Sequence, residues 1–298
     1  MNNYSTMTIK KLHPFPVEKS RILQQKSLLY RRTILQMIYR AKAGHTGGSL
    51  SCVDILNVLY NHIMNITPEN FTKVNRDHYI HSKGHSVEAL YAVLADKGFF
   101  PIELLDNVEK YSSDFIGHPT RSVLGIEQNT GALGHGLSVA VGMALAAKKD
   151  GRPDRIFTIM GDGELTEGSI WEASASATHY QLDNLIAIID LNTLQITGRT
   201  TDVMNMEPLE AKFTAFGYAV RHVDGNNVEE LVTLLEDLPF EPGRPNLVLA
   251  RTVKGKGISF MEDRILWHHR VPTEVEYAAA LLELEQAEKY LEKADGHL

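Results

Sequence analysis

Short runs of apolar residues, many of them β-branched, recur along the chain between longer segments of mixed polarity. The clearest runs are residues 155–160, 185–191 and 246–252, each followed by polar or glycine-containing turns. Runs of this length predict buried strands. Weaker strands are expected at 77–81 and 218–223. Because helical patterns separate these strands, the sequence predicts an α/β fold with a mostly parallel sheet and helices on both faces.

The segments between the expected strands carry apolar residues at helical spacing, and we expect them to form helices. Their approximate ranges are 18–40, 51–64, 87–97, 137–148, 169–179, 208–216, 228–235 and 273–293. The glycine-rich stretch 44–48 is expected to be a turn that ends the first helix. We interpret residues 1–298 as a single domain, with a core at about 18–270 and a C-terminal helical arm at about 273–295.

Polar residues come directly after two of the expected strands. Gly161-Asp162-Gly163 closes one strand, and Asn192 closes the next. Parallel strands joined by a right-handed crossover end at the same edge of a sheet, so Asp162 and Asn192 should meet there. Their oxygens suit a Mg²⁺ ion that arrives with a diphosphate, because Mg²⁺ takes one or two protein ligands plus phosphate oxygens. The glycines let the backbone approach the phosphates, and the next helix points its N-terminus at the anion.

Length and composition exclude several classes of protein. A chain of 298 residues with 43% apolar and 22% charged residues can bury a substantial core. The net charge of −7 and the lack of a basic stripe argue against a nucleic-acid partner. The apolar runs are shorter than the roughly 20 residues that a membrane span needs. The polar start at 1–16 predicts no secretory signal, and the single cysteine, Cys52, favours the cytoplasm.

Several short motifs, in a fixed order, make the sequence similar to a known family. Together they resemble the N-terminal half of transketolases, and the stretch from Gly161 to Asn192 resembles the thiamine diphosphate fingerprint. The other matching segments are 44–49, 82–85, 117–119, 130–136, 167–168, 252–257 and 267–268. The resemblance implies a thiamine diphosphate-binding fold with thiamine diphosphate and Mg²⁺ as cofactors.

The resemblance also implies roles for individual residues. His45, His85 and His268 would transfer protons, and His45, His118 and His268 would contact the substrate. An imidazole suits proton transfer because its pKa lies near neutral pH. The implied cofactor contacts are His85, Gly131, Leu133, Gly161, Asp162, Gly163, Glu167 and Asn192. The implied ligands of Mg²⁺ are Asp162, Asn192 and the backbone carbonyl of Leu194.

Some of these assignments stay open. The preceding tryptophan favours His268 as the site histidine, while the neighbouring His269 stands where the family usually has glycine. Glu167 resembles a family glutamate at the subunit interface, but a carboxylate at a helix N-terminus is also favoured by the helix dipole. Lys254 and Lys256 could touch phosphates, yet two lysines in a loop are more often solvated.

The resemblance implies an enzyme that works as one of two chains. In transketolases a glutamate from a second, pyrimidine-binding domain activates the cofactor ring, and we expect this chain, which ends at Leu298, to lack that domain. Our hypothesis is the N-terminal subunit of a split transketolase, which pairs with a separate C-terminal subunit. The pairs would self-associate into a heterotetramer. The enzyme would transfer a two-carbon ketol unit from a ketose or ketose phosphate to an aldose.

Two other functions are considered. One is the diphosphate-binding subunit of a 2-oxo acid dehydrogenase decarboxylase, which the histidine motifs near residues 45, 85 and 118 fit poorly. The other is a non-catalytic, cofactor-binding scaffold, against which the intact Asp162 and Asn192 argue. The sequence does not identify the sugar donor, the sugar acceptor or the partner chain.

Overall fold

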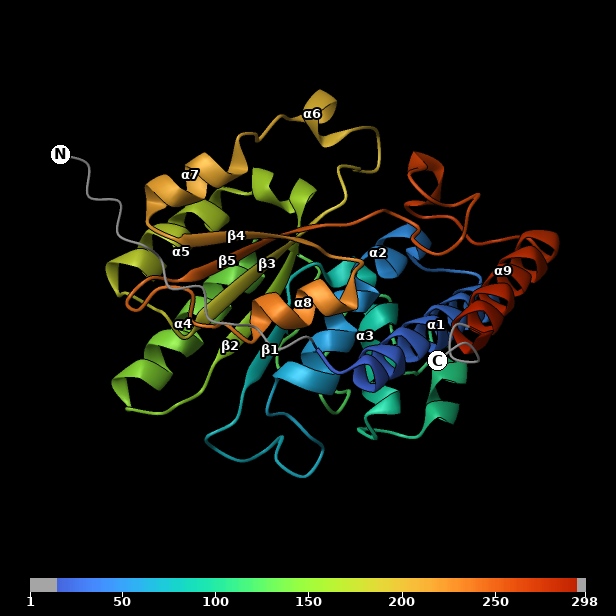
Figure 1. Cartoon of the computed structure of the whole chain (residues 1–298), viewed down its shortest axis with the longest axis horizontal. Helices are drawn as coiled ribbons and strands as arrows, with labels where there is room; N and C mark the ends of the chain where they lie inside the picture. Colours follow the sequence, from blue (N-terminus) through green and yellow to red (C-terminus); the bar gives the residue numbers. More distant parts are fainter. Residues whose placement is uncertain (1–14, 294–298) are drawn as a thin grey trace.

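The computed structural model describes residues 15–293 and contains one sheet of five parallel strands (Figure 1). Predictions made for residues 1–14 and 294–298 lie outside the described residues. The strand order is β1-β2-β3-β5-β4. The strands are β1 (His78–His81), β2 (Ile156–Gly161), β3 (Leu185–Leu191), β4 (Ala219–Asp224) and β5 (Asn246–Arg251). The predicted α/β class with a parallel sheet is confirmed.

Right-handed crossovers explain which helices cover each face of the sheet. From β1 the chain steps in one direction to β2, β3 and the edge strand β4, and then it returns to insert β5 between β3 and β4. The outward steps place on one face the helices α4 (His135–Lys149), α5 (Gly168–His179) and α7 (Leu209–Phe216). The return step places α8 (Val228–Leu235) on the other face, with α1 (Val17–Ala41), α2 (Thr46–Val58) and α3 (Val87–Asp96).

The sheet divides the interior into two hydrophobic cores, because successive side chains along a strand point to opposite faces. In β3, Ile186 and Ile188 pack in the core beside α1, α2 and α3, whereas Leu185 and Ile189 pack in the core beside α4 and α5. Every residue of β3 is buried. Burial on both faces is the reason why this strand reads as a continuous apolar run in the sequence.

The second helix begins earlier than predicted. It begins at Thr46 and not near residue 51, so Gly47 and Gly48 lie in its first turn and do not form a separate turn. A Cβ atom on Gly47 would lie 2.7 Å from the carbonyl oxygen of Trp267. Glycine is therefore needed for close packing against the segment at Trp267, and this packing outweighs its low helix propensity.

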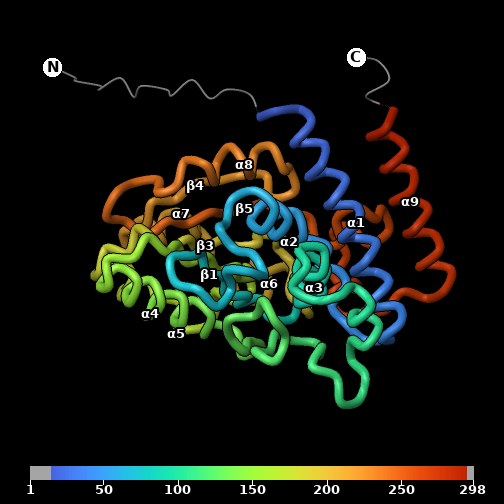
Figure 2. The backbone as a smooth tube through the Cα atoms, turned by 90° about the horizontal axis from the view of Figure 1, so that it is seen from below, coloured from blue at the N-terminus to red at the C-terminus, as the bar shows by residue number. Residues whose placement is uncertain are grey.

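The C-terminal helix α9 (Glu274–Lys293) lies beside α1, and the pair extends from one end of the molecule (Figures 1 and 2). Ala280 and Leu284 of α9 are buried, as expected for an amphipathic arm. Short helical segments complete the chain at Leu59–Ile63, Gly84–Ser86, Ile102–Asn107, Asp162–Thr166, α6 (Thr200–Val203) and Ile265–Trp267. In the described part of the chain, no helix has the length and apolarity needed to cross a membrane.

Candidate active site

A cavity of about 440 Å³ opens at the carboxyl edge of the sheet. Its wall is built from the start of α2 and from segments that follow β1, β2, β3 and β5. It gathers nearly all the residues assigned from the sequence, namely His45, His85, His118, Gly131, Leu133, Gly161, Asp162, Gly163, Asn192, Leu194 and His268. Glu167 does not line it: this residue is exposed and precedes the first turn of α5.

Asp162 is buried immediately after β2, where it connects two strand ends. Its Oδ1 accepts the N–H of Gly163 at 2.9 Å, and its Oδ2 accepts the N–H of Thr193 at 2.5 Å. Because Thr193 lies just beyond β3, the ends of β2 and β3 meet as the strand pattern predicts. Burial, followed by repulsion from Asp190, raises the pKa of Asp162 to about 6. A divalent cation at this carboxylate would offset both effects.

Asn192 and Leu194 place two further oxygens beside this carboxylate. The side-chain nitrogen of Asn192 donates to Oδ2 of Asp190 at 3.0 Å, and its Oδ1 accepts the N–H of Leu194 at 3.1 Å. The carbonyl of Leu194 accepts a hydrogen bond from Lys254 at 2.7 Å, which leaves it a second lone pair. Carboxylate, amide and backbone oxygens are the ligands that Mg²⁺ prefers, so the donor set fits this ion.

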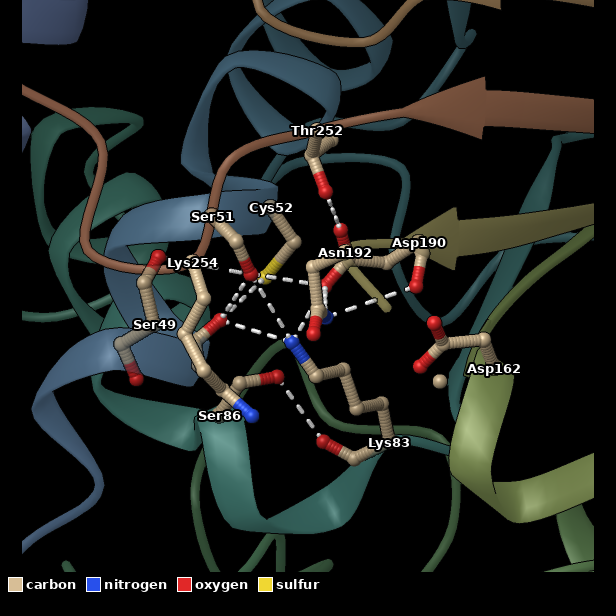
Figure 3. Close-up of polar contacts among 12 residues, drawn as sticks. Ser49, Ser51, Cys52, Lys83, Ser86, Asp162, Asp190, Asn192, Thr252 and Lys254 are labelled. Atoms are coloured by element: carbon tan, nitrogen blue, oxygen red, sulfur yellow. Dashed lines mark hydrogen bonds and ion pairs between the residues drawn. The ribbon is translucent and has the colours of Figure 1, made fainter. Parts of the chain in front are cut away.

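A buried ion pair supports this end of the cavity, and the sequence analysis missed it (Figure 3). The ammonium group of Lys83 lies 2.5 Å from Oδ2 of Asp190 and also donates to the carbonyl of Gly48 at 2.8 Å. Ser51 and Thr252 donate to the same carboxylate. Burial opposes the charge on both partners, yet their attraction raises the pKa of Lys83 and lowers that of Asp190. A charged residue inside an apolar strand was the signal that could have revealed the pair.

Lys254 is buried, so the expectation that it is solvated is wrong. Its exposed fraction is 1%, and its Nζ lies 2.7 Å from the carbonyl of Leu194 and 2.9 Å from Nδ1 of His268. Burial, and then the charge of Lys83, lowers the pKa of Lys254 to about 8. By contrast, Lys256 is partly exposed and lies 3.3 Å from a carboxylate oxygen of Glu262. Lys254 thus brings positive charge to the point where the oxygen ligands and the histidines meet.

The four histidines assigned from the sequence form one cluster. The ring centroid of His45 lies 5.2 Å from that of His85, 6.2 Å from that of His118 and 5.8 Å from that of His268. Burial is the largest cause of their low pKa values, which are about 4 for His45 and about 3 for His268. The pKa of His85 is also lowered well below its usual range. Near neutral pH these imidazoles are uncharged and can either donate or accept a hydrogen bond.

The adjacent histidines at 268 and 269 have different surroundings. His268 lines the cavity, with its ring stacked at 5.4 Å from that of His85. His269 is exposed, and its ring centroid lies 4.5 Å from that of His45. The cavity-lining histidine is therefore His268, which the sequence favours, while His269 lies at the outer rim of the cavity.

Glu164, another residue missed in the sequence, fixes the loop that carries Leu133. Its Oε1 accepts the N–H of Gly134 at 2.9 Å and the hydroxyl of Ser82, and its Oε2 accepts the N–H of Gly161 at 3.1 Å. The side chain is buried, and this burial raises its pKa. One carboxylate therefore connects three of the segments that line the cavity.

Glu88 has a similar role at the start of α2. Its Oε1 accepts the N–H of His45 at 3.1 Å, and its Oε2 accepts the hydroxyl of Ser49 at 2.7 Å. The N-terminus of α2 has no capping hydrogen bond from the side chain of His45 itself. Glu88 therefore stabilises the first turn from outside the helix and holds the backbone of His45 in place.

Two features of the cavity point to a polar ligand. Buried nitrogens of His45 (Nδ1) and Gln195 (Nε2) have no hydrogen-bond partner among the described residues. A Cβ on Gly163 would lie 2.9 Å from Cγ of Gln195, and one on Gly131 would lie 2.7 Å from the ring of His118. No group of three or more His, Cys, Asp or Glu residues within 15–293 could hold a metal ion alone. A metal here would need ligand oxygens, as Mg²⁺ has when a diphosphate accompanies it.

The fold and the cavity define a cofactor-binding α/β domain that is suited to a diphosphate and a divalent cation. The family described as "Transketolase, thiamine diphosphate binding domain" matches residues 24–275. The chain belongs to this family.

Individual relatives agree with this assignment. The chain is 45% identical over 274 residues to one of the subunits of the apulose-4-phosphate transketolase of Phocaeicola vulgatus, covering 92% of this chain and 98% of that protein. It is 44% identical over 265 residues to the 6-deoxy-6-sulfo-D-fructose transketolase subunit SqwG of a Clostridium species, covering 89% and 96%. The crystal structure of the Campylobacter jejuni transketolase matches with a TM-score of 0.84 and 33% identity, covering 91% of this chain and 43% of that one.

These matches confirm the predicted family, fold and class of enzyme, a thiamine diphosphate-dependent transketolase subunit. The chain has nearly the length of the two subunit relatives but spans less than half of the solved transketolase chain. The roles of individual site residues stay predictions.

Proposed function

We propose that this chain binds the diphosphate and Mg²⁺ of a two-chain transketolase, which transfers a two-carbon ketol unit from a ketose to an aldose. The observation that carries the proposal is the single cavity in which the Asp162–Asn192 oxygens and four clustered histidines meet. One end suits an anchored diphosphate, and the other suits a substrate that exchanges protons.

The residues at the first end would hold the cofactor. Asp162, Asn192 and the carbonyl of Leu194 would ligate Mg²⁺, and Lys254 would offset phosphate charge. When bound, thiamine diphosphate supplies the nucleophilic, electron-accepting carbon that ketol transfer needs. Leu133 lines the same cavity and would pack against the cofactor. The chain itself contributes position, charge and the exclusion of water.

The histidines would hold and move protons at the oxygens of the substrate. Since the pKa values of His45, His85 and His268 are lowered, each ring is neutral at pH 7. A neutral ring can accept a proton from a hydroxyl group or donate a hydrogen bond to a carbonyl oxygen. His118 would orient the sugar through a further contact.

The second chain would supply the pyrimidine-binding domain and its ring-activating glutamate. Two relatives of similar length are each one of the subunits of an apulose-4-phosphate transketolase, which supports such a division. We propose that paired copies assemble into a heterotetramer, and the exposed Glu167 is our candidate for a contact between them. We further propose a cytoplasmic location, which is supported by a lone cysteine, Cys52, that is free and buried.

The names of the relatives also suggest the class of donor. Apulose 4-phosphate and 6-deoxy-6-sulfo-D-fructose are both ketoses that carry an anionic group. We propose that the donor of this enzyme belongs to the same chemical class.

Purification of the tagged chain from its source cells, followed by mass identification of its partner, tests the proposal. The reassembled enzyme is then offered apulose 4-phosphate or 6-deoxy-6-sulfo-D-fructose, with D-glyceraldehyde 3-phosphate as acceptor. We expect ketol transfer only with both chains, thiamine diphosphate and Mg²⁺. Full activity from this chain alone would contradict the division into subunits. Cofactor binding without transfer would favour a scaffold, and release of carbon dioxide from 2-oxo acids would favour a decarboxylase.

A further inference from the structure

His269 lies at the rim of the cavity on a segment that is fixed at both ends. On one side the indole of Trp267 is buried and donates to the carbonyl of Phe260 at 3.1 Å. On the other side the hydroxyl of Thr46, at the start of α2, donates to the carbonyl of Arg270 at 2.6 Å. The backbone at His269 is therefore held against the first turn of α2, next to His45.

The ring of His269 is available to a ligand. It is exposed, it lies with its centroid 4.5 Å from that of His45, and the two planes are tilted by 59°. Its nitrogens form no hydrogen bond or ion pair with any residue in 15–293 that the structure describes. The neighbouring His268 differs, because its Nδ1 lies 2.9 Å from Lys254.

The position of this ring relates to the length of the sugar. The proposed proton-transferring residues His45, His85 and His268 line the cavity, so the two transferred carbons would lie among them. The remaining carbons of a longer sugar have to extend past His45 toward the opening. His269 is placed to meet that part of the substrate and not the transferred unit.

The chemistry at the rim favours hydroxyl groups over an anion. The adjacent cation, Arg270, donates to Glu276 at 2.7 Å and stacks on Trp267, with its Cζ 4.7 Å from the ring centroid. Its charge is therefore already paired. An imidazole with two free nitrogens can accept from one sugar hydroxyl and donate to another.

We propose that His269 is a specificity-determining residue that binds the hydroxyl-bearing carbons of the ketose beyond the two-carbon unit. This inference rests on the proposed function of the same cavity. It predicts that the residue distinguishes substrates by what lies past the bond that breaks.

The test compares two donors in the assembled two-chain enzyme with His269→Ala. One donor is the ketose, apulose 4-phosphate or 6-deoxy-6-sulfo-D-fructose, that the unaltered enzyme uses better. The other is hydroxypyruvate, which has no hydroxyl beyond the transferred unit. We expect kcat/KM for the ketose to fall about tenfold, mainly through KM, as the loss of one or two hydrogen bonds predicts. Kinetics with hydroxypyruvate should not change.

Matched variants exclude a structural explanation. His269→Gln, which keeps a donor and an acceptor, should restore part of the ketose activity. His179→Ala changes an exposed histidine at the C-terminal end of α5, far along the chain from the rim, and should match the unaltered enzyme on both donors. Thermal midpoint and thiamine diphosphate affinity should not move in any of them.

The outcomes separate this inference from the proposed function. Equal losses with both donors, no loss with the ketose, or a lower thermal midpoint would overturn the role of His269 alone. An unaltered enzyme that transfers from neither donor would overturn the proposed function and this inference with it.

Discussion

The two ends of the cavity differ in how completely their polar groups are paired. At the anchoring end, Asp162, Asp190 and Lys83 are buried, charged and hydrogen-bonded to several partners each. At the histidine end, burial keeps the rings uncharged, and a buried nitrogen of His45 has no partner among the described residues. A cofactor that stays bound can be met by preorganised charges. A substrate that enters and leaves is better met by neutral groups with open hydrogen-bonding capacity.

The largest effect is expected from a change at the anchoring end. Asp162→Ala removes the carboxylate that we assign to Mg²⁺, so affinity for thiamine diphosphate in the presence of Mg²⁺ should fall by more than about a hundredfold. Calorimetric titration of the purified chain measures this affinity, and Asp150→Ala, at an exposed turn, is the control. Unchanged affinity would remove Asp162 from the metal site.

The ion pair below the anchoring end should dominate stability. Lys83→Met leaves the Asp190 carboxylate buried without its cation, and we expect the free energy of unfolding to fall by about 3–5 kcal/mol. Denaturant titration measures the loss. The double variant Lys83→Met with Asp190→Leu should lose less than the sum of the two single variants, because it buries no unpaired charge. Strict additivity would show that the pair does not act as a unit.

The histidine end should make stability depend on pH. Because the pKa of His45 is lowered to about 4 from the model-peptide value of 6.5, the unfolded chain binds protons that the folded chain excludes between these values. Stability is therefore complete above about pH 6.5 and decreases as the pH falls toward 4. His45→Asn should flatten this decrease by an amount on the order of 1 kcal/mol, since the ring is partly accessible to solvent. An unchanged slope would contradict the buried, neutral state of this ring.

The smallest effect is expected from an ion pair of the same charge type at the surface. Arg199 and Asp263 approach to 2.6 Å, but their side chains are 41% and 53% exposed, against 2% and 0% for Lys83 and Asp190. Arg199→Ala should lower the free energy of unfolding by less than about 1 kcal/mol. A loss as large as that of Lys83→Met would mean that burial does not set the difference between the two ends.

Local pattern predicted the parts of the site that depend on strand ends. The run before Asp162 and the run before Asn192 are recognisable in the sequence, and the handedness of the crossover then requires their carboxyl ends to meet. The ordered glycine and histidine motifs added His45, His85, His118 and His268. All of these residues line the cavity in the structure.

Pairing between distant segments could not be predicted in the same way. Lys83 and Asp190 are separated by 107 positions, and Glu88 accepts a hydrogen bond from the backbone of His45 across 43 positions. Lys254 was expected to be solvated because its local sequence is a polar loop, yet a carbonyl and an imidazole from other segments enclose it. Burial of a charge depends on such partners, which no local pattern contains.

All segments that line the cavity follow the carboxyl ends of strands or begin α2, so the opposite edge of the sheet takes no part in the site. The exposed Lys149, at the end of α4, lies before β2 at that opposite edge. Burial raises the pKa of the thiol of Cys52 to about 11, which makes the natural cysteine unreactive. A cysteine introduced at Lys149 would therefore be a single point of attachment for a dye or a solid support. The chain could then be immobilised with its cavity free, and the arrival of a second chain could be timed directly.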